Sequence, residues 1–321
     1  MENVSETIPQ VLHKLAERLE TTVEGHTINI PEKFGKGYCT GFVFNDHVRM
    51  LICNYELYED VVLRNPDLDA ARRMLFFKFR NIFPSSPTEL LKRNLVDAPS
   101  VLIVTSRINT DEVIAVHSNT ATVNIEVDAS YLNRLFGSTA ISPVLQSLLQ
   151  NKQPLLFEQV VYPSLQKIVS EIITESISET FKLFFLRVKA EELICRLLME
   201  LEKRDEKQLA ALNTRDVQTL YQIRRQILEQ LGKPPAIKPL AGIAGMSATK
   251  LKRLFRQVFG NSIFSYYQEF RIREAARLLK EDGLSVSEAG YRLGFTNLSH
   301  FTKVFEDHIG MKPKQYSLLK K

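Results

Sequence analysis

The chain has 321 residues, of which 44% are hydrophobic and 25% charged, the proportions of an ordinary globular protein long enough for two domains. Its start carries early acidic residues and no apolar core segment, and no apolar run approaches the roughly 20 residues that span a bilayer. We therefore expect a cytoplasmic protein without membrane contact. Cys39, Cys53 and Cys195 are widely spaced, which argues against a disulfide framework or a structural zinc site.

Charge is distributed unevenly along the chain. Residues 215–321 contain 19 Lys and Arg against 9 Asp and Glu, whereas the remainder contains 23 basic and 28 acidic residues. A basic module joined to an acidic body is the electrostatic pattern expected of nucleic-acid binding. Basic domains also bind membranes and acidic proteins, so the charge alone does not choose among these partners.

The first part of the chain is predicted to be rich in strands. A short amphipathic helix over residues 12–19 precedes five β-branched or aromatic runs, which are separated by breakers such as Pro66, Pro84 and Asn109. Short strands with turns between them favour a sandwich or barrel over alternating strand–helix units. The five runs are YCTGFVFN (38–45), VRMLICNYEL (48–57), RRMLFFKFRNIF (72–83), SVLIVTS (100–106) and ATVNIEV (121–127).

From Tyr131 to about Arg204 the pattern becomes helical. Apolar residues recur at helical spacing, most clearly from Leu183 to Leu201. So broad an apolar stripe packs either on the β-rich part or on the same helix of a second chain. The charged run at 202–207 then indicates a linker, and a second helical region begins near Thr214.

A repeat within this last region carries the functional prediction. The segments LKRLFRQVFG (251–260) and FTKVFEDHIG (301–310) repeat one apolar helical face and a closing glycine at a constant offset of 50 residues. Each follows a short helix and a turn that contains Gly245 or Gly294. A short helix, a tight turn and an amphipathic helix make a helix-turn-helix. Two copies are much more specific than one.

A long helix is predicted between the two units. In SYYQEFRIREAARLLKEDG (265–283), Ile272, Ala275 and Leu279 share one side, and Gly283 follows as a stop. A rigid connector keeps two recognition helices at a fixed separation. One chain can then place them in successive major grooves about 34 Å apart.

The side chains opposite the apolar faces are the candidate DNA contacts. Arg and Lys reach guanine O6 and N7 or phosphates, and Ser, Thr and Asn serve either. A solvated face is the ordinary explanation on an isolated helix, but the duplicated scaffold favours DNA. The candidates are Thr249, Lys250, Lys252, Arg253 and Arg256 on the first helix, and Asn297, Ser299, His300 and Lys303 on the second.

The region from about Tyr221 to Tyr316 resembles the DNA-binding domain of the AraC/XylS family. This resemblance covers roughly the last third of the chain and implies two helix-turn-helix subdomains, base contacts from both recognition helices and transcription activation near a promoter. Its most specific elements are Arg271 with Ala275 and Leu279, Gly294-Phe295, Phe301 with Phe305, and Gly310-x-x-Pro313-x-x-Tyr316.

One departure from the family pattern concerns packing. The family usually has a large aliphatic residue followed by Ala where this chain has Ala289-Gly290. Both choices lose packing, and Gly in a helix costs about 1 kcal/mol relative to Ala. The second unit is therefore predicted to be less rigid or less tightly bound than the first.

The first two-thirds of the chain shows no catalytic or metal constellation. The histidines are scattered, with no pair at zinc-ligand spacing. Neither a Gly-rich phosphate loop nor a serine nucleophile elbow is present in the sequence. Alkyl-transferring repair domains need a reactive cysteine beside Pro, and none of the three cysteines follows Pro. We therefore expect neither an enzyme nor a metal site.

The layout of this part also resembles the same family. Residues 30–128 resemble its small β-barrel sensor, and residues 131–205 its helical dimerisation segment. GKGYCTGFVFNDHVRMLICNYEL (35–57) and two later segments resemble the pyochelin-responsive subgroup, which implies an effector such as an iron–siderophore complex. Alternating aromatic residues in strands usually belong to a core, but those that could line a ligand cavity are Tyr38, Phe42, Phe44, Tyr55 and Tyr58.

Together these observations predict an α+β protein. It has a β-rich effector-sensing domain with a small cupin-like barrel (1–130), a helical dimerisation segment (131–205), a linker (206–213) and an all-α DNA-binding domain (214–321). The predicted function is a ligand-responsive transcription activator whose partners are double-stranded DNA, RNA polymerase, a small-molecule effector and a second copy. Two alternatives remain open: a DNA repair or modification enzyme with a helix-turn-helix targeting module, and a basic protein-interaction module.

Overall fold

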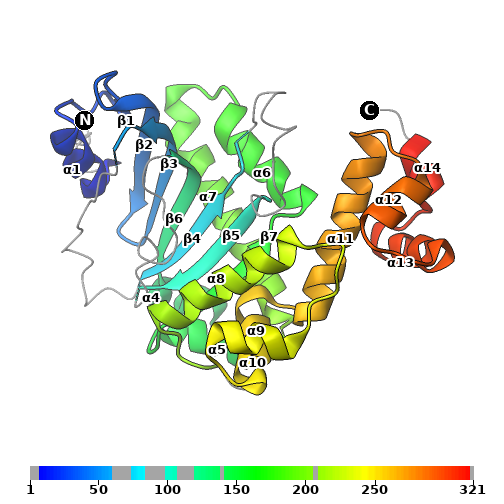
Figure 1. Cartoon of the computed structure of the whole chain (residues 1–321). Coiled ribbons are helices and arrows are strands. Elements are labelled where there is room, and N and C mark those ends of the chain that lie inside the picture. Colours follow the sequence, from blue (N-terminus) through cyan, green and yellow to red (C-terminus); the bar gives the residue numbers. More distant parts are fainter. Residues whose placement is uncertain are drawn as a thin grey trace. The chain divides into compact units, whose positions relative to one another are not determined.

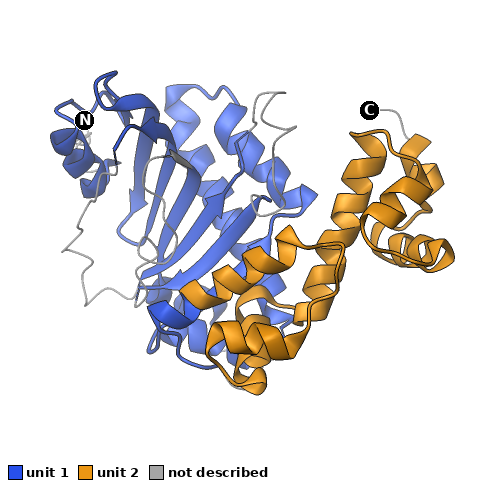
Figure 2. Cartoon of the chain, viewed as in Figure 1, with its two compact units in different colours: residues 1–91, 98–217 blue, residues 92–97, 218–321 orange. Residues whose placement is uncertain are grey.

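The computed structural model describes residues 7–59, 74–83, 98–106, 119–137, 141–204 and 209–318. They divide into two compact units, one reaching Val217 and the other beginning at Gln218 (Figure 2). This division falls inside helix α8 (Thr214–Glu229), a few residues after the predicted linker, of which residues 206–208 lie outside the described part. No described helix is long and apolar enough to cross a membrane.

The first unit contains one antiparallel sheet with the strand order β1-β2-β3-β6-β4-β5-β7 (Figure 1). The five predicted strands are confirmed as β2 to β6. The three-residue β1 and the strand β7, which lies in the part predicted to be helical, are additions. The strands are β1 (Thr27–Asn29), β2 (Gly35–Asn45), β3 (Val48–Leu57), β4 (Met74–Arg80), β5 (Ser100–Thr105), β6 (Asn119–Asp128) and β7 (Leu156–Val160).

The described strands do not close into the expected barrel. The end strands β1 and β7 each pair on one side only, with β2 and β5 respectively, so the sheet is open. Helices cover its apolar face, which therefore needs no second sheet. Phe77, Ile103 and Ile125 from the strands share one buried core with the helices that follow β6. These helices are α4 (Ala129–Phe136), α5 (Pro143–Gln150), α6 (Pro163–Thr174) and α7 (Glu179–Glu202).

Helix α7 shows where the predicted apolar stripe packs. Leu193 and Leu197 are fully buried in the same core as the strands, so the stripe packs within its own chain. The opposite side of α7 leaves Phe181, Phe184 and Met199 more than half exposed, at 63%, 69% and 59%. A role of α7 in dimerisation thus concerns this second side and stays a prediction.

The predicted N-terminal helix is confirmed as α1 (Gln10–Arg18). Its apolar side, which includes Leu12 and Leu15, packs on the other face of β2 and β3. Cys39 and Cys53 belong to this second, smaller core. The two strands are joined by a tight turn, in which the Asn45 side-chain oxygen accepts hydrogen bonds from the amides of His47 and Val48 at 2.8 and 2.9 Å.

The second unit repeats one design twice, as predicted. Helices α10 and α13 each have 12 residues and begin 50 residues apart. Each ends at a left-handed glycine, Gly260 or Gly310, with φ of 78° and 83°. The helices of this unit are α8 (Thr214–Glu229), α9 (Ile237–Ala244), α10 (Ala248–Phe259), α11 (Ile263–Lys280), α12 (Val286–Arg292), α13 (Leu298–Ile309) and α14 (Pro313–Leu318).

The structure contradicts the predicted loss of packing at Gly290. A Cβ atom at this position would lie 2.9 Å from Leu298 Cδ2 and 3.1 Å from Phe301 Cδ1, and Ala289 is fully buried. Side chains of α13 therefore already fill the space that a larger residue at 290 would occupy. Gly290 lets α12 approach α13 closely, and a looser second unit does not follow from it.

Two left-handed glycines give a matched test of this close packing. Gly294 and Gly310 have φ of 73° and 83°, but only at Gly294 would a Cβ meet backbone, at 2.0 Å from the Gly232 carbonyl oxygen. Gly310→Ala should lower the free energy of unfolding by about 1–2 kcal/mol, because alanine disfavours the left-handed backbone. Gly294→Ala should lower it clearly more, because the backbone at residue 294 must also move away from the backbone at Gly232. Hydrogen exchange of residues 218–318 measures both losses, and equal losses would contradict the packing argument.

Candidate nucleic-acid interface

The first recognition helix, α10, separates an apolar side from a basic side. The Ser247 hydroxyl accepts a hydrogen bond from the Lys250 amide at 3.2 Å and begins the helix. Leu254, Phe255 and Val258 are buried on one side. On the other side the predicted contacts Thr249, Lys252, Arg253 and Arg256 are exposed, and Lys250 is half-buried.

The second recognition helix, α13, has the same arrangement with fewer cations. Among the predicted contacts, Ser299, His300 and Lys303 are exposed. Asn297 is also exposed, but its side-chain oxygen caps the helix by accepting hydrogen bonds from the Ser299 and His300 amides, at 2.9 and 3.1 Å. This capping leaves only the amide nitrogen of Asn297 for a base or a phosphate.

Four basic side chains of the two helices are available to an outside anion. In the described part of the chain, Lys252, Arg253, Arg256 and Lys303 form no ion pair or hydrogen bond through their side chains. The acidic residues of the connector α11 are instead bound locally. Glu269 pairs with Arg273 at 2.7 Å, and Glu274 pairs with Arg277 at 2.9 Å. Uncompensated cations on an exposed helix face favour phosphate contact.

The connector α11 holds the two helix-turn-helix units at a fixed separation. Its 18 residues span about 27 Å. Near its beginning, Tyr266 packs against the rings of Phe255 and Phe259 of α10, with both centroids at 5.4 Å. Further along, the buried Arg271 guanidinium donates to the Leu293 carbonyl at 2.8 Å and lies 3.5 Å from the centroid of the Phe295 ring. Both helix-turn-helix units therefore pack on one rigid helix.

The five aromatic residues predicted for an effector cavity do not line one site. Tyr38, Phe42 and Phe44 pack toward the core beneath α5 to α7, whereas Tyr55 packs toward the core beneath α1. Tyr58 is 72% exposed. Because successive side chains of a strand point to opposite faces, residues 38 and 55 of paired strands fall on different sides of the sheet.

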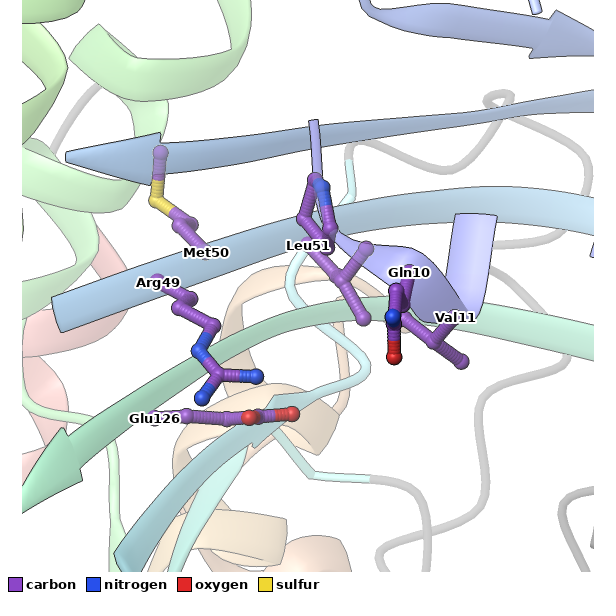
Figure 3. Close-up of a pocket in the computed structure, with 7 residues that line it drawn as sticks. Gln10, Val11, Arg49, Met50, Leu51 and Glu126 are labelled. Carbon is purple, nitrogen blue, oxygen red and sulfur yellow. The ribbon is translucent and has the colours of Figure 1, made fainter. Parts of the chain in front are cut away.

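A small pocket on the α1 side of the sheet was not predicted. It has about 40 Å³ of space for water-sized molecules, enough for roughly three of them. Arg49 of β3 and Glu126 of β6 are direct register partners whose charged ends lie close to one another there, beside Gln10 (Figure 3). Burial raises the pKa of Glu126, and the Arg49 charge opposes this rise. The sequence shows a charged residue within each of these two strands, but their pairing depends on the register between the strands.

Comparison with known proteins agrees with the geometry of the second unit. Residues 240–318 match the family described as a helix-turn-helix domain. Residues 240–318 form a helix-turn-helix domain of the AraC type. This AraC-type domain includes both recognition helices, and the family-level resemblance of this part of the chain is confirmed to that extent.

Relatives of the AraC-type domain are named as regulators. The HTH-type transcriptional regulator GlxA of Rhizobium meliloti is 38% identical over 74 residues, which are 23% of each chain. The regulatory protein PchR of Pseudomonas aeruginosa is 39% identical over 71 residues, 22% of this chain and 24% of PchR. The chain thus spans less than a quarter of either relative. A solved AraC-type regulator structure from Chromobacterium violaceum is 26% identical, with a TM-score of 0.31, and covers 33% of this chain and 94% of that one.

Single substitutions on α10 test the interface. Lys252→Ala or Arg253→Ala should each weaken binding to a specific DNA site by about 1–3 kcal/mol if the residue contacts a base. A phosphate contact would weaken all sequences alike and reduce the slope of log affinity against log salt by about 1. Fluorescence anisotropy over a salt series measures both quantities.

The matched control is Arg225→Ala. Arg225 is equally exposed but lies on α8, outside both helix-turn-helix units. It removes the same charge, so a similar loss of affinity in this variant would mean that general charge, and not the α10 face, is responsible.

Proposed function

We propose that this protein is a sequence-specific DNA-binding transcription regulator that activates its target genes. One observation carries the proposal: two capped recognition helices, held on one connector, expose Lys252, Arg253, Arg256 and Lys303, whose side chains have no partner among the described residues. Two helices at a fixed separation can enter successive major grooves of one duplex. The names of its relatives support the same class of function.

The two recognition helices differ in charge, which gives them different tasks. Helix α10 carries Lys250, Lys252, Arg253 and Arg256, whereas α13 carries Lys303 and two exposed acids, Glu306 and Asp307, toward its end. In this proposal α10 supplies most of the electrostatic affinity. The polar side chains of α13 then add base-specific hydrogen bonds, which contribute more to specificity than to overall affinity.

The proposed regulator acts as a homodimer that recruits RNA polymerase in the cytoplasm. The exposed apolar residues of α7, Phe181, Phe184 and Met199, support self-association, because burying them removes apolar surface from water. The resemblance of the sensor region supports an effector such as an iron–siderophore complex. Binding of the effector would favour the DNA-competent state of the protein.

The pocket beside α1 is the proposed effector contact, in place of the aromatic set. Arg49 and Glu126 form no hydrogen bond or ion pair with other described residues, although their charged ends lie close together (Figure 3). They suit a ligand with an anionic group for Arg49 and a neighbouring hydrogen-bond donor for Glu126. A pocket of this size holds one functional group of the ligand and not the whole molecule.

A footprint of the full chain on the DNA upstream of its own gene tests the proposed function. The experiment needs physiological salt and excess competitor DNA, because non-specific binding dominates at low salt. We expect protection of two major grooves one helical turn apart. If neither this DNA nor a random-sequence selection yields a preferred site, the protein-interaction alternative replaces the regulator. Alkyl transfer or base modification of the bound DNA would instead indicate the enzyme alternative.

Thermal unfolding with ferric pyochelin tests the effector proposal. A ligand at 100 times its dissociation constant stabilises the native state by about 2.7 kcal/mol. The melting temperature of the first unit, which contains the pocket, should therefore rise. Arg49→Met should abolish the rise, whereas Tyr58→Ala should not. The absence of a rise in the unmodified protein would refute this effector, and an equal rise in Arg49→Met would refute the pocket.

A further inference from the structure

Two cysteines that the sequence keeps 14 residues apart are neighbours in the structure. Cys39 of β2 and Cys53 of β3 are direct register partners, and their Sγ atoms lie 3.0 Å apart. Both thiols are free and buried, with 2% and 6% of each residue exposed. Spacing alone gave no sign of this contact, because it depends on the register of the β2–β3 hairpin.

The backbone at this pair suits a covalent bond between the sulfurs. The Gly37 carbonyl accepts from the Ile30 amide, and the Gly41 amide donates to the His26 carbonyl, both at 2.9 Å, so these alternate residues of β2 bond to the β1 side. Cys39 is the alternate residue between Gly37 and Gly41, so its amide and carbonyl also point toward β1 and away from β3. Cys39 and Cys53 are therefore a non-hydrogen-bonded pair of the β2–β3 ladder. Cα atoms of such pairs are about 4.5 Å apart, within the range of about 4.4–6.8 Å that a disulfide allows.

We propose that Cys39 and Cys53 are an oxidative modification site, at which a small peroxide converts the two thiols into an intramolecular disulfide. One sulfur attacks a peroxide oxygen and becomes a sulfenic acid, with loss of one water. The second thiol then attacks that sulfur, the S–S bond forms, and the hydroxyl leaves with the second thiol proton as another water. Two thiols and one hydrogen peroxide thus give one disulfide and two waters, and the sulfurs supply both electrons.

The surroundings select the kind of oxidant. Leu12, Leu15 and Ala16 of α1 pack in the same core as the two thiols, so a bulky disulfide reagent has no direct access. The hydrogen bond with the Cys53 thiol and burial raise the pKa of Cys39, so the reactive thiolate is scarce and the reaction is slow. Hydrogen peroxide is small and uncharged enough to reach such a site. Cys195 is exposed on α7 and reacts separately.

The test uses the full chain with Cys195→Ser, which leaves only the buried pair. After hydrogen peroxide treatment, mass spectrometry should find a loss of two hydrogens per chain and a peptide that links residues 39 and 53. The melting temperature should rise by about 5 °C, because the bond restricts the unfolded chain. Both changes should disappear with dithiothreitol.

The matched controls separate a true disulfide from other oxidation. Cys39→Ser and Cys53→Ser, each combined with Cys195→Ser, should lose the linked peptide and the thermal shift. Sulfinic or sulfonic acid on either cysteine without a linked peptide would overturn the proposal. So would two thiols that stay free after a peroxide exposure prolonged well beyond the time that oxidises the exposed Cys195 in the unmodified protein. The mass measurement on the unmodified protein keeps the test valid if a serine variant does not fold. None of these outcomes depends on DNA binding.

Discussion

The Arg271 guanidinium is buried among aromatic rings in the second unit, and the orientation of the second recognition helix, α13, on the connector depends on it. Burying a charge is costly unless it is hydrogen-bonded and compensated. Here the Leu293 carbonyl accepts at 2.8 Å, and the faces of Phe295 and Tyr267 lie 3.5 and 5.4 Å away. Burial lowers the pKa of Arg271. Because Leu293 and Phe295 flank the Gly294 turn, one side chain of the connector fixes the turn that orients α13.

The same local chemistry then positions each recognition helix. Ser247 and Asn297 cap the beginnings of α10 and α13, and left-handed Gly260 and Gly310 close their ends. Such caps satisfy backbone groups that a helix end leaves unpaired. Because the caps lie at the two ends, the exposed polar side chains in the middle of each helix are not needed to pair its backbone groups. The repeat is therefore a repeat of helix boundaries and apolar positions, while the exposed residues differ between the two copies.

Features that depend on neighbouring residues could be predicted from the sequence, whereas features that depend on contacts between distant segments could not. The helix-turn-helix units, the connector and strands β2 to β6 were predictable because capping, glycine turns and apolar spacing are local. The Cys39–Cys53 contact and the Arg49–Glu126 pocket were missed because each depends on the register between strands. The open sheet and the strand β7 were missed for the same reason, since pairing partners decide whether a sheet closes. At Gly290 the family pattern misled, because Leu298 and Phe301 already occupy the space.

The proposed function requires one rigid chain to place α10 and α13 in neighbouring grooves of one DNA site. The most direct measurement is the affinity for the footprinted site after inserting five or ten base pairs between the two protected grooves. Five base pairs turn the second groove to the opposite face, and ten restore the face but add about 34 Å. Because α11 spans only about 27 Å, we predict that both insertions reduce the affinity at least ten-fold. Unchanged affinity with either insertion would contradict a rigid pair of recognition helices.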